Sequence, residues 1–116
     1  MRTWDDWSDF EVNKAVAERL GLVTGGANDN YACVKVKKSE DYRAWYLVDY
    51  CNSWNDIGPI IERNNITIAC YDGEWSAFSG FRPWADTDIR DNETHCKNIK
   101  RAAAIVFLIM NGVNPD

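Results

Sequence analysis

A few side chains in this sequence have the chemistry that a catalytic or metal site requires. The adjacent residues His95 and Cys96 could supply two zinc ligands, or a nucleophile and its base. Neighbouring side chains usually point apart, however, and the four cysteines form no Cys-x-x-Cys pair. Glu62, Asp56 or His95 could act as a base, but no activated nucleophile or acid–base pair accompanies them. We therefore expect no catalysis, no metal ion and no cofactor, and we interpret the cysteines as free thiols.

A polar segment that leads into Gly58 and Pro59 holds the most unusual local pattern. Ser53 is the expected N-cap of a short helix, and Asp56 is expected to reach back to it in a capping box. Trp54 is then the first helical residue. Pro59 has no N–H to give to the preceding turn, so we expect that turn to be kinked or partly 3₁₀.

Two interpretations of this turn are open. In the structural one, the helix packs on a sheet and Gly58 is present because another element passes close to it. In the functional one, the loosened turn exposes backbone N–H groups and an indole ring at a cleft. The candidate ligand-binding residues of the turn are Asn52, Ser53, Trp54, Asp56, Gly58 and Pro59.

The segment 52–63, Asn-Ser-Trp-Asn-Asp-Ile-Gly-Pro-Ile-Ile-Glu-Arg, resembles the signature of the NinX-like phage proteins. In that family a polar segment with Trp precedes Gly-Pro-Ile-Ile-Glu. The opening helix and the segment 101–110 are similar to the family too, and the resemblance is weakest over 25–50 and 81–96. It implies a small accessory protein of a tailed bacteriophage or prophage that acts in the cytoplasm of the infected bacterium. It implies no known reaction.

The composition excludes several classes of function. The 116 residues are expected to form one domain, and the net charge of −5 argues against direct binding to nucleic acid. The longest apolar run, 102–110, is about half the length that a bilayer requires, so we expect a core helix and no membrane contact. The N-terminus lacks the apolar core of a signal peptide. Aromatic residues beyond those that fill the core are candidates for binding.

The two terminal helices have contrasting patterns. The first begins at an N-cap, Ser8, with Glu11 completing a capping box, and ends at Gly21. Its expected solvated side carries Asn13, Lys14, Glu18 and Arg19. The last helix, with Thr94 as its expected cap, is apolar nearly all round and needs a sheet plus either the first helix or a second subunit, which makes a homodimer possible. Its Arg101 either pairs with a carboxylate or meets an anionic ligand.

Alternating patterns predict two β-hairpins. The first joins strands over 31–37 and 44–50, and the second joins strands over 66–70 and 75–78 through Asp72-Gly73, a hairpin turn signal. The resulting fold class is α+β, with an antiparallel sheet of about four strands packed against three helices, one N-terminal, one short and central, and one C-terminal. The segment 79–95 has no periodicity. We interpret it as a binding loop through Phe81, Arg82 and Trp84, with simple packing or disorder as alternatives.

Two classes of binding function follow. In the first, Trp54 and the segment 81–92 form a pocket for a small polar or nucleotide-like ligand, which would suit sequestration of a host immune signal in counter-defence. In the alternative, an exposed aromatic surface docks onto a host or phage protein, and the protein acts as an inhibitor or adaptor.

Overall fold

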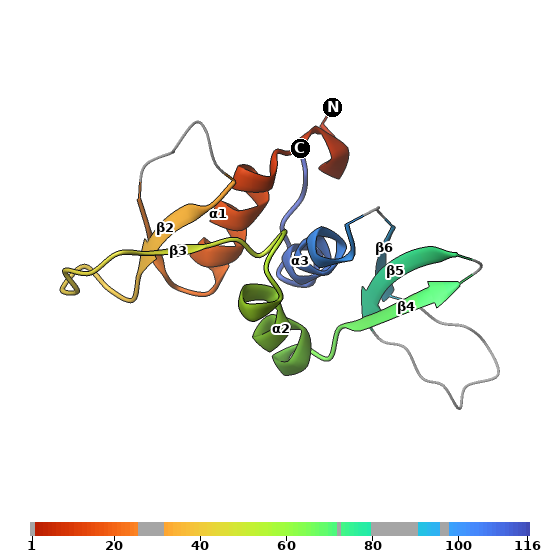
Figure 1. Ribbon diagram of the computed structural model, residues 1–116. Helices are drawn as coiled ribbons and strands as arrows, with labels where there is room; N and C mark the ends of the chain where they lie inside the picture. Colours follow the sequence, from red (N-terminus) through yellow and green to blue (C-terminus); the bar gives the residue numbers. More distant parts are fainter. Residues whose placement is uncertain (1, 26–31, 72, 80–90, 96–97) are drawn as a thin grey trace.

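The computed structural model describes residues 2–25, 32–71, 73–79, 91–95 and 98–116. In Figure 1 the α-helices occupy the centre of the molecule, with a small sheet on either side of them. The helical elements are a 3₁₀ turn η1 (Trp4–Asp6), α1 (Asp9–Arg19), α2 (Trp54–Arg63) and α3 (Ile99–Met110). The N-terminal, short central and C-terminal helices predicted from the sequence are therefore present.

The strands form two antiparallel sheets, each with three strands in sequence order. The first sheet contains β1 (Val23–Thr24), β2 (Val34–Lys37) and β3 (Tyr46–Val48). The second sheet contains β4 (Thr67–Tyr71), β5 (Glu74–Ser79) and β6 (Asp91–His95). The α+β class is confirmed, but the strands are divided between two sheets where the sequence had suggested one.

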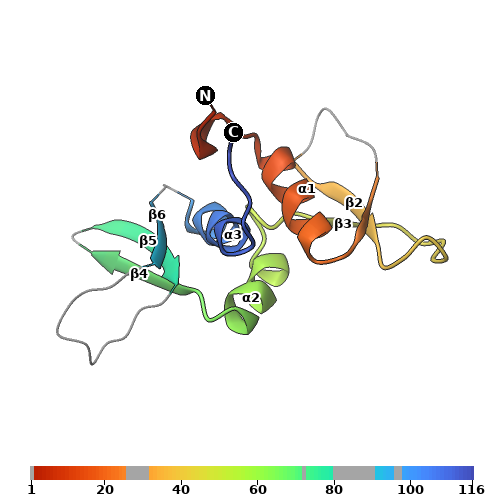
Figure 2. The ribbon, with the colours of Figure 1, turned by 180° about the vertical axis from the view of Figure 1, so that it is seen from behind.

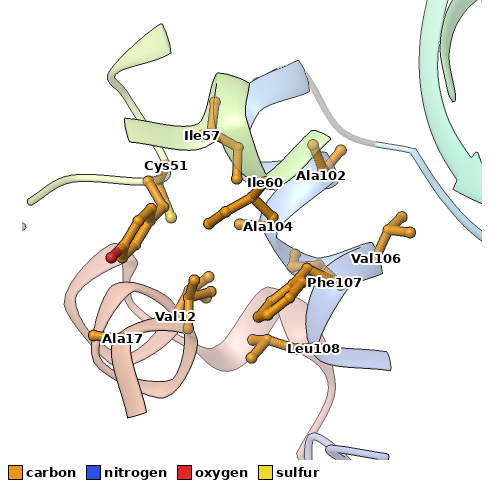
Figure 3. Packing of buried hydrophobic residues seen from close by; sticks show 14 of the residues in the cluster. Val12, Ala17, Cys51, Ile57, Ile60, Ala102, Ala104, Val106, Phe107 and Leu108 are labelled. Atoms are coloured by element: carbon orange, nitrogen blue, oxygen red, sulfur yellow. The ribbon is translucent and has the colours of Figure 1, made fainter. Parts of the chain in front are cut away.

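Helix α3 explains this division, because it needs cover on every side. Each residue from Ala102 to Leu108 is buried. Helix α1, helix α2 and strands β5 and β6 all pack against α3, and Figures 1 and 2 show α3 between the first helix and the second sheet. The close view in Figure 3 shows Val12 of α1 and Ile60 of α2 facing Phe107 and neighbouring residues of α3. The sequence left either the first helix or a second subunit to cover α3 beside the sheet, and the first helix packs against it.

The predicted ends of α1 are confirmed. Glu11 N donates to Ser8 Oγ at 3.1 Å, and Ser8 N donates to Glu11 Oε1 at 3.1 Å, which is a complete capping box. Gly21 follows the helix with φ of +82°, a conformation that favours glycine. Arg2 Nη2 lies 2.8 Å from Glu11 Oε2, and this hydrogen bond is the main reason that the pKa of Glu11 is lowered.

The predicted caps of the other two helices are wrong in detail. Ser53 is the N-cap residue of α2, but its side chain makes no capping hydrogen bond. Asp56 does not reach back to Ser53, because its carboxylate accepts a bond from Asp49 N at 2.9 Å. Helix α3 is capped by Asn98, whose Oδ1 accepts from the backbone of the first turn. Thr94 is in strand β6 instead.

Helix α2 remains α-helical through Pro59. Asp56 N makes a 3₁₀-type bond to Ser53 O at 3.2 Å, and Ile57 N makes the α-type bond to the same oxygen at 3.0 Å. The proline lies on the exposed side. The predicted 3₁₀ character is thus a single bond beside a regular turn.

Both predicted hairpins are present. Val34 lies opposite Val48 in the first, and Tyr71 lies opposite Glu74 in the second. Gly73, in the turn of the second hairpin, has φ of +83°. The two strands that the sequence reading missed are β1, which is only two residues long, and β6, which lies in a segment without periodicity.

Candidate functional site

The opening turn of α2 places one aromatic ring at the surface. The Trp54 side chain is 49% exposed. Lys100 Nζ, from the first turn of α3, lies 4.9 Å from the centroid of the indole ring. A cation over an indole face at this distance is an attractive contact of about 0.5 to 1 kcal/mol at an exposed site. The turn therefore presents an aromatic ring together with a positive charge.

The Gly58 and Pro59 step is also open to solvent. A Cβ atom built on Gly58 would meet nothing within 4 Å. The idea that Gly58 is needed because another element passes close by is therefore wrong. Pro59 is exposed on the next position of the helix. Both residues have low helix propensity, and neither is explained by packing.

The polar side chains near this turn bond mainly to one another. We call the set that joins α1, α2 and α3 the polar junction. Its members are Asp9, Asn13, Asp49, Asn52, Asp56, Asn98 and Arg101.

Asn52 is held by three other members of the junction. Its Nδ2 donates to Asp9 Oδ2 at 3.2 Å and to Asp49 Oδ1 at 3.1 Å. Its Oδ1 accepts from Asn98 Nδ2 at 3.0 Å. Asp56 is likewise engaged by Asp49 N. Two of the predicted ligand contacts, Asn52 and Asp56, therefore have internal partners.

Asn13 is a buried member of the junction that the sequence reading assigned to the solvated side of α1. That assignment is wrong, because the residue is fully buried. Its Nδ2 donates to Asp49 Oδ1 and to Ala32 O, both at 2.9 Å, and its Oδ1 accepts from Cys51 N at 3.0 Å. An amide with this set of partners can be buried without leaving an unpaired polar atom.

Of the two roles expected for Arg101, an ion pair or contact with an anionic ligand, the structure shows the ion pair. Its Nη1 lies 2.7 Å from Asp9 Oδ1, and its Nη2 donates to Trp4 O at 2.8 Å and to Trp7 O at 2.7 Å. The guanidinium thus joins α3 to α1 and to the 3₁₀ turn before it. Its side chain is only 14% exposed, so these partners account for much of its surface.

The predicted site extends beyond the part of the chain that the structure describes. Phe81, Arg82 and Trp84 lie outside the described residues. The described residues of the predicted site divide into two groups. Asn52, Asp56 and Arg101 belong to the polar junction, whereas Ser53, Trp54, Gly58 and Pro59 form the opening half of α2.

The thiol next to the junction is not activated. Cys51 is fully buried, and burial raises the pKa of its thiol, with the nearby Asp9 carboxylate adding to the effect and Arg101 opposing it. Burial also raises the pKa of the Tyr50 hydroxyl. Both groups therefore remain protonated at neutral pH, when a nucleophilic thiol would need the opposite shift.

A second candidate surface lies on the β2–β3 hairpin, and the sequence reading did not single it out. We call it the hairpin surface, and its members are Tyr42 (53% exposed), Trp45 (43%), Tyr46 (45%) and Leu47 (61%). Lys37 Nζ lies 4.6 Å from the centroid of the Trp45 ring. The sequence did contain a signal for it. Successive side chains of a strand point to opposite faces, and Val48 points into the core. Leu47 and Trp45, at odd spacings from Val48, are therefore expected on the face opposite the buried valines.

Within the described ranges, no group of three or more His, Cys, Asp or Glu side chains could hold a metal ion. Among the helices that the structure describes, none is both long and apolar enough to cross a membrane.

Fold and surfaces together define a small α+β protein with an internally bonded polar junction and aromatic side chains at its surface. Residues 4–111 match the family model described as Bacteriophage P22, NinX. The chain therefore belongs to this family of phage proteins, as the resemblance at residues 52–63 predicted. A comparison with curated proteins finds no match.

Proposed function

We propose that this phage protein acts by binding a host or phage protein through its hairpin surface, as an inhibitor or adaptor and not as an enzyme. The observation that carries the proposal is the exposure of Leu47 (61%) and Trp45 (43%), two large side chains at alternate positions on the outer face of the hairpin, with Tyr46 (45%) exposed between them on the opposite face. Aromatic side chains dominate the energetic centres of protein interfaces. Grouped apolar residues at a surface mark such interfaces more often than single ones do.

The position of the hairpin supports this proposal. Figures 1 and 2 show the β2–β3 hairpin extending away from the three helices. A partner can therefore reach the hairpin surface without displacing any part of the helical core. The proposed setting is the interior of the infected bacterium, where host and phage proteins are both accessible.

A pocket for a small polar ligand has less support from the polar junction, because Asn52 and Asp56 already have partners within the chain. One observation still favours it as a second candidate. The Trp54 ring and Lys100 lie together, and among the described residues no hydrogen bond is made by the N–H groups of Trp54 and Asn55. A nucleotide-like ligand would suit this turn, because its base can stack on the ring and its phosphate can meet the Lys100 ammonium and the two N–H groups.

Affinity capture with matched variants tests the first candidate. The tagged full-length chain is incubated with lysate of infected cells, and stoichiometric partners are identified by mass spectrometry. We expect Trp45→Ala with Leu47→Ala to abolish capture. Trp75→Ala, which removes a 49% exposed indole from β5, is the matched control and should retain the partner. Equal capture by all three proteins would contradict the proposal.

Thermal-shift screening with nucleotides tests the second candidate. A ligand at about 100 times its Kd stabilises the folded state by about 2.7 kcal/mol, which gives a readily measured shift. The shift should disappear in Trp54→Ala and persist in Trp75→Ala. No shift with any nucleotide would remove the second candidate and leave the first unaffected.

A further inference from the structure

Strand β3 is at the edge of its sheet, and the direction of its backbone groups can be worked out from its neighbours. The sheet order is β1-β2-β3, so β3 has a strand on one side only. Gly25 N donates to Lys35 O at 2.8 Å, so the backbone polar groups of Lys35 point toward β1. These directions alternate along an antiparallel strand, so those of Val34 and Val36 point toward β3.

The same alternation continues across the ladder. Val34 lies opposite Val48 and Val36 lies opposite Tyr46, so Tyr46 and Val48 turn their backbone groups toward β2. Leu47, between them, turns its N–H and C=O outward. Among the described residues, no hydrogen bond from outside the ladder reaches these two groups. The outer side of β3 therefore has an unpaired donor and an unpaired acceptor.

Asp49 limits this open edge at one end. Its N–H donates to Asp56 Oδ2 at 2.9 Å, and its C=O accepts from Ser53 N at 2.9 Å. The outward-facing groups at this position are thus already paired. The open edge therefore lies at Leu47, on the part of β3 that leads back toward Trp45. An added strand therefore cannot continue past Asp49 in the direction of helix α2.

The charge of the hairpin is opposite to that of the rest of the chain. Residues 34–48 contain four Lys or Arg and two Asp or Glu, which gives +2 in a chain whose net charge is −5. Lys37 is partly neutralised, because its Nζ lies 3.7 Å from Glu40 Oε2. Lys35, Lys38 and Arg43 are exposed, and none of them forms an ion pair with another described residue.

We infer that the open edge of β3 binds an extended, acidic segment of the partner protein, which adds a fourth strand to the sheet. This inference rests on the proposed function of the hairpin surface. Main-chain hydrogen bonds at Leu47 hold the added strand, and the apolar side chains of Leu47 and Trp45 pack against it. Its carboxylates meet the free cationic side chains of the hairpin.

The charge argument also distinguishes this occupant from a second copy of the chain. Two hairpins paired edge to edge would bring two segments of charge +2 together. Like charges across a pairing edge oppose association and disfavour the wrong partner. An acidic segment gains from the same charges.

A library of displayed random peptides tests the inference. Peptides that bind the immobilised, purified protein are selected and sequenced. We expect the selected peptides to be rich in Asp and Glu and in β-branched residues, and poor in Pro. Fluorescence anisotropy with a fluorescein-labelled selected peptide then gives the Kd. The Kd should rise with salt, because exposed charges are screened.

Two substitutions at one position separate the backbone from the side chain. Leu47→Pro removes the outward N–H and leaves the β2–β3 ladder intact, since an edge strand tolerates proline where its N–H faces solvent. Leu47→Ala removes the side chain and keeps the N–H. We expect the proline variant to bind about tenfold more weakly than the alanine variant. Circular dichroism checks that both are folded.

A charge variant keeps the test decisive if Leu47→Pro does not fold. Lys35→Glu with Arg43→Glu should weaken binding of the selected peptide by at least about tenfold. Peptides without an acidic bias, or equal binding by the two Leu47 variants, would overturn the inference. A dimer in size-exclusion chromatography that Leu47→Pro dissociates would assign the edge to a second copy. A lysate partner that still binds Leu47→Pro would overturn strand addition and leave the proposed docking function standing.

Discussion

Asn13 Nδ2 lies 2.9 Å from Asp49 Oδ1, and this part-buried bond joins helix α1 to the segment that leads into helix α2. The same amide also bonds Ala32 O and Cys51 N. Asn13→Ala leaves all three partner groups short of a hydrogen bond. We expect the free energy of unfolding to fall by about 2 to 4 kcal/mol. Urea unfolding followed by tryptophan fluorescence measures it.

The control for this prediction is the next residue of the same helix. Lys14 is exposed, so Lys14→Ala should change the free energy of unfolding by no more than about 0.5 kcal/mol. If Asn13→Ala were as mild as Lys14→Ala, the buried amide would not be an important connection between the two helices.

The guanidinium of Arg101 is expected to need its planar shape. It bonds Asp9 through one nitrogen and the carbonyl oxygens of Trp4 and Trp7 through another. A lysine ammonium cannot reproduce this fork, so Arg101→Lys should destabilise the fold by about 1 to 3 kcal/mol. Near-ultraviolet circular dichroism should change as well, because the Trp4 and Trp7 rings are 4.9 Å apart.

An exposed arginine provides the comparison for Arg101. Arg63, in the last turn of α2, is exposed, and Arg63→Lys should leave both the unfolding midpoint and the aromatic signal close to those of the unchanged protein. Similar behaviour of the two variants would mean that the bonds of Arg101 contribute little to stability.

The sequence was most informative where a local pattern determines local structure. The capping box at Ser8 and Glu11 and the turn at Gly73 are formed by residues close together in the chain, and both were predicted. The division into two sheets was not predicted. It depends on how the apolar surface of α3 is shared among elements far apart in sequence, and no local pattern records this.

The burial of Asn13 shows the same limit for the candidate site. Its place among polar residues of α1 indicated a solvated face, whereas its partners, Asp49 and Cys51, lie more than 30 residues away in sequence. A buried amide looks like a surface amide until its partners are known. The exposure of Trp54 belonged to one of the two interpretations that the sequence left open, and the structure decides it with a residue that is 49% exposed.

Stability should decline at alkaline pH because of Cys51. Burial raises the pKa of its thiol above the ordinary value of 9.0. The unfolded chain therefore loses this proton first, so the contribution is complete below about pH 9 and decreases as the pH rises above it. For one group the decline approaches about 1.4 kcal/mol per pH unit. Tyr50, whose pKa is also raised by burial, adds to it above pH 10.

Cysteine variants isolate this effect. Cys51→Ser removes the buried thiol, so its free energy of unfolding should fall less between pH 8 and pH 10 than that of the unchanged protein. Cys70 is exposed, and Cys70→Ser should follow the unchanged protein. Urea unfolding at several pH values gives the slopes, and parallel slopes for all three proteins would argue against a role for the Cys51 proton.

Gly58 and Pro59 should both reduce the stability of helix α2. A Cβ at position 58 meets nothing within 4 Å, so Gly58→Ala should stabilise the fold by about 0.5 to 1 kcal/mol. Pro59→Ala restores a backbone donor within the helix and should stabilise it further, by up to about 3 kcal/mol. Chemical denaturation of each variant and of the double variant measures both effects. If either alanine destabilises the fold, the glycine or proline has a structural role at this turn. If both stabilise it, the best remaining account of the pair is binding near Trp54, and the same variants should then lose the thermal shift caused by a nucleotide-like ligand.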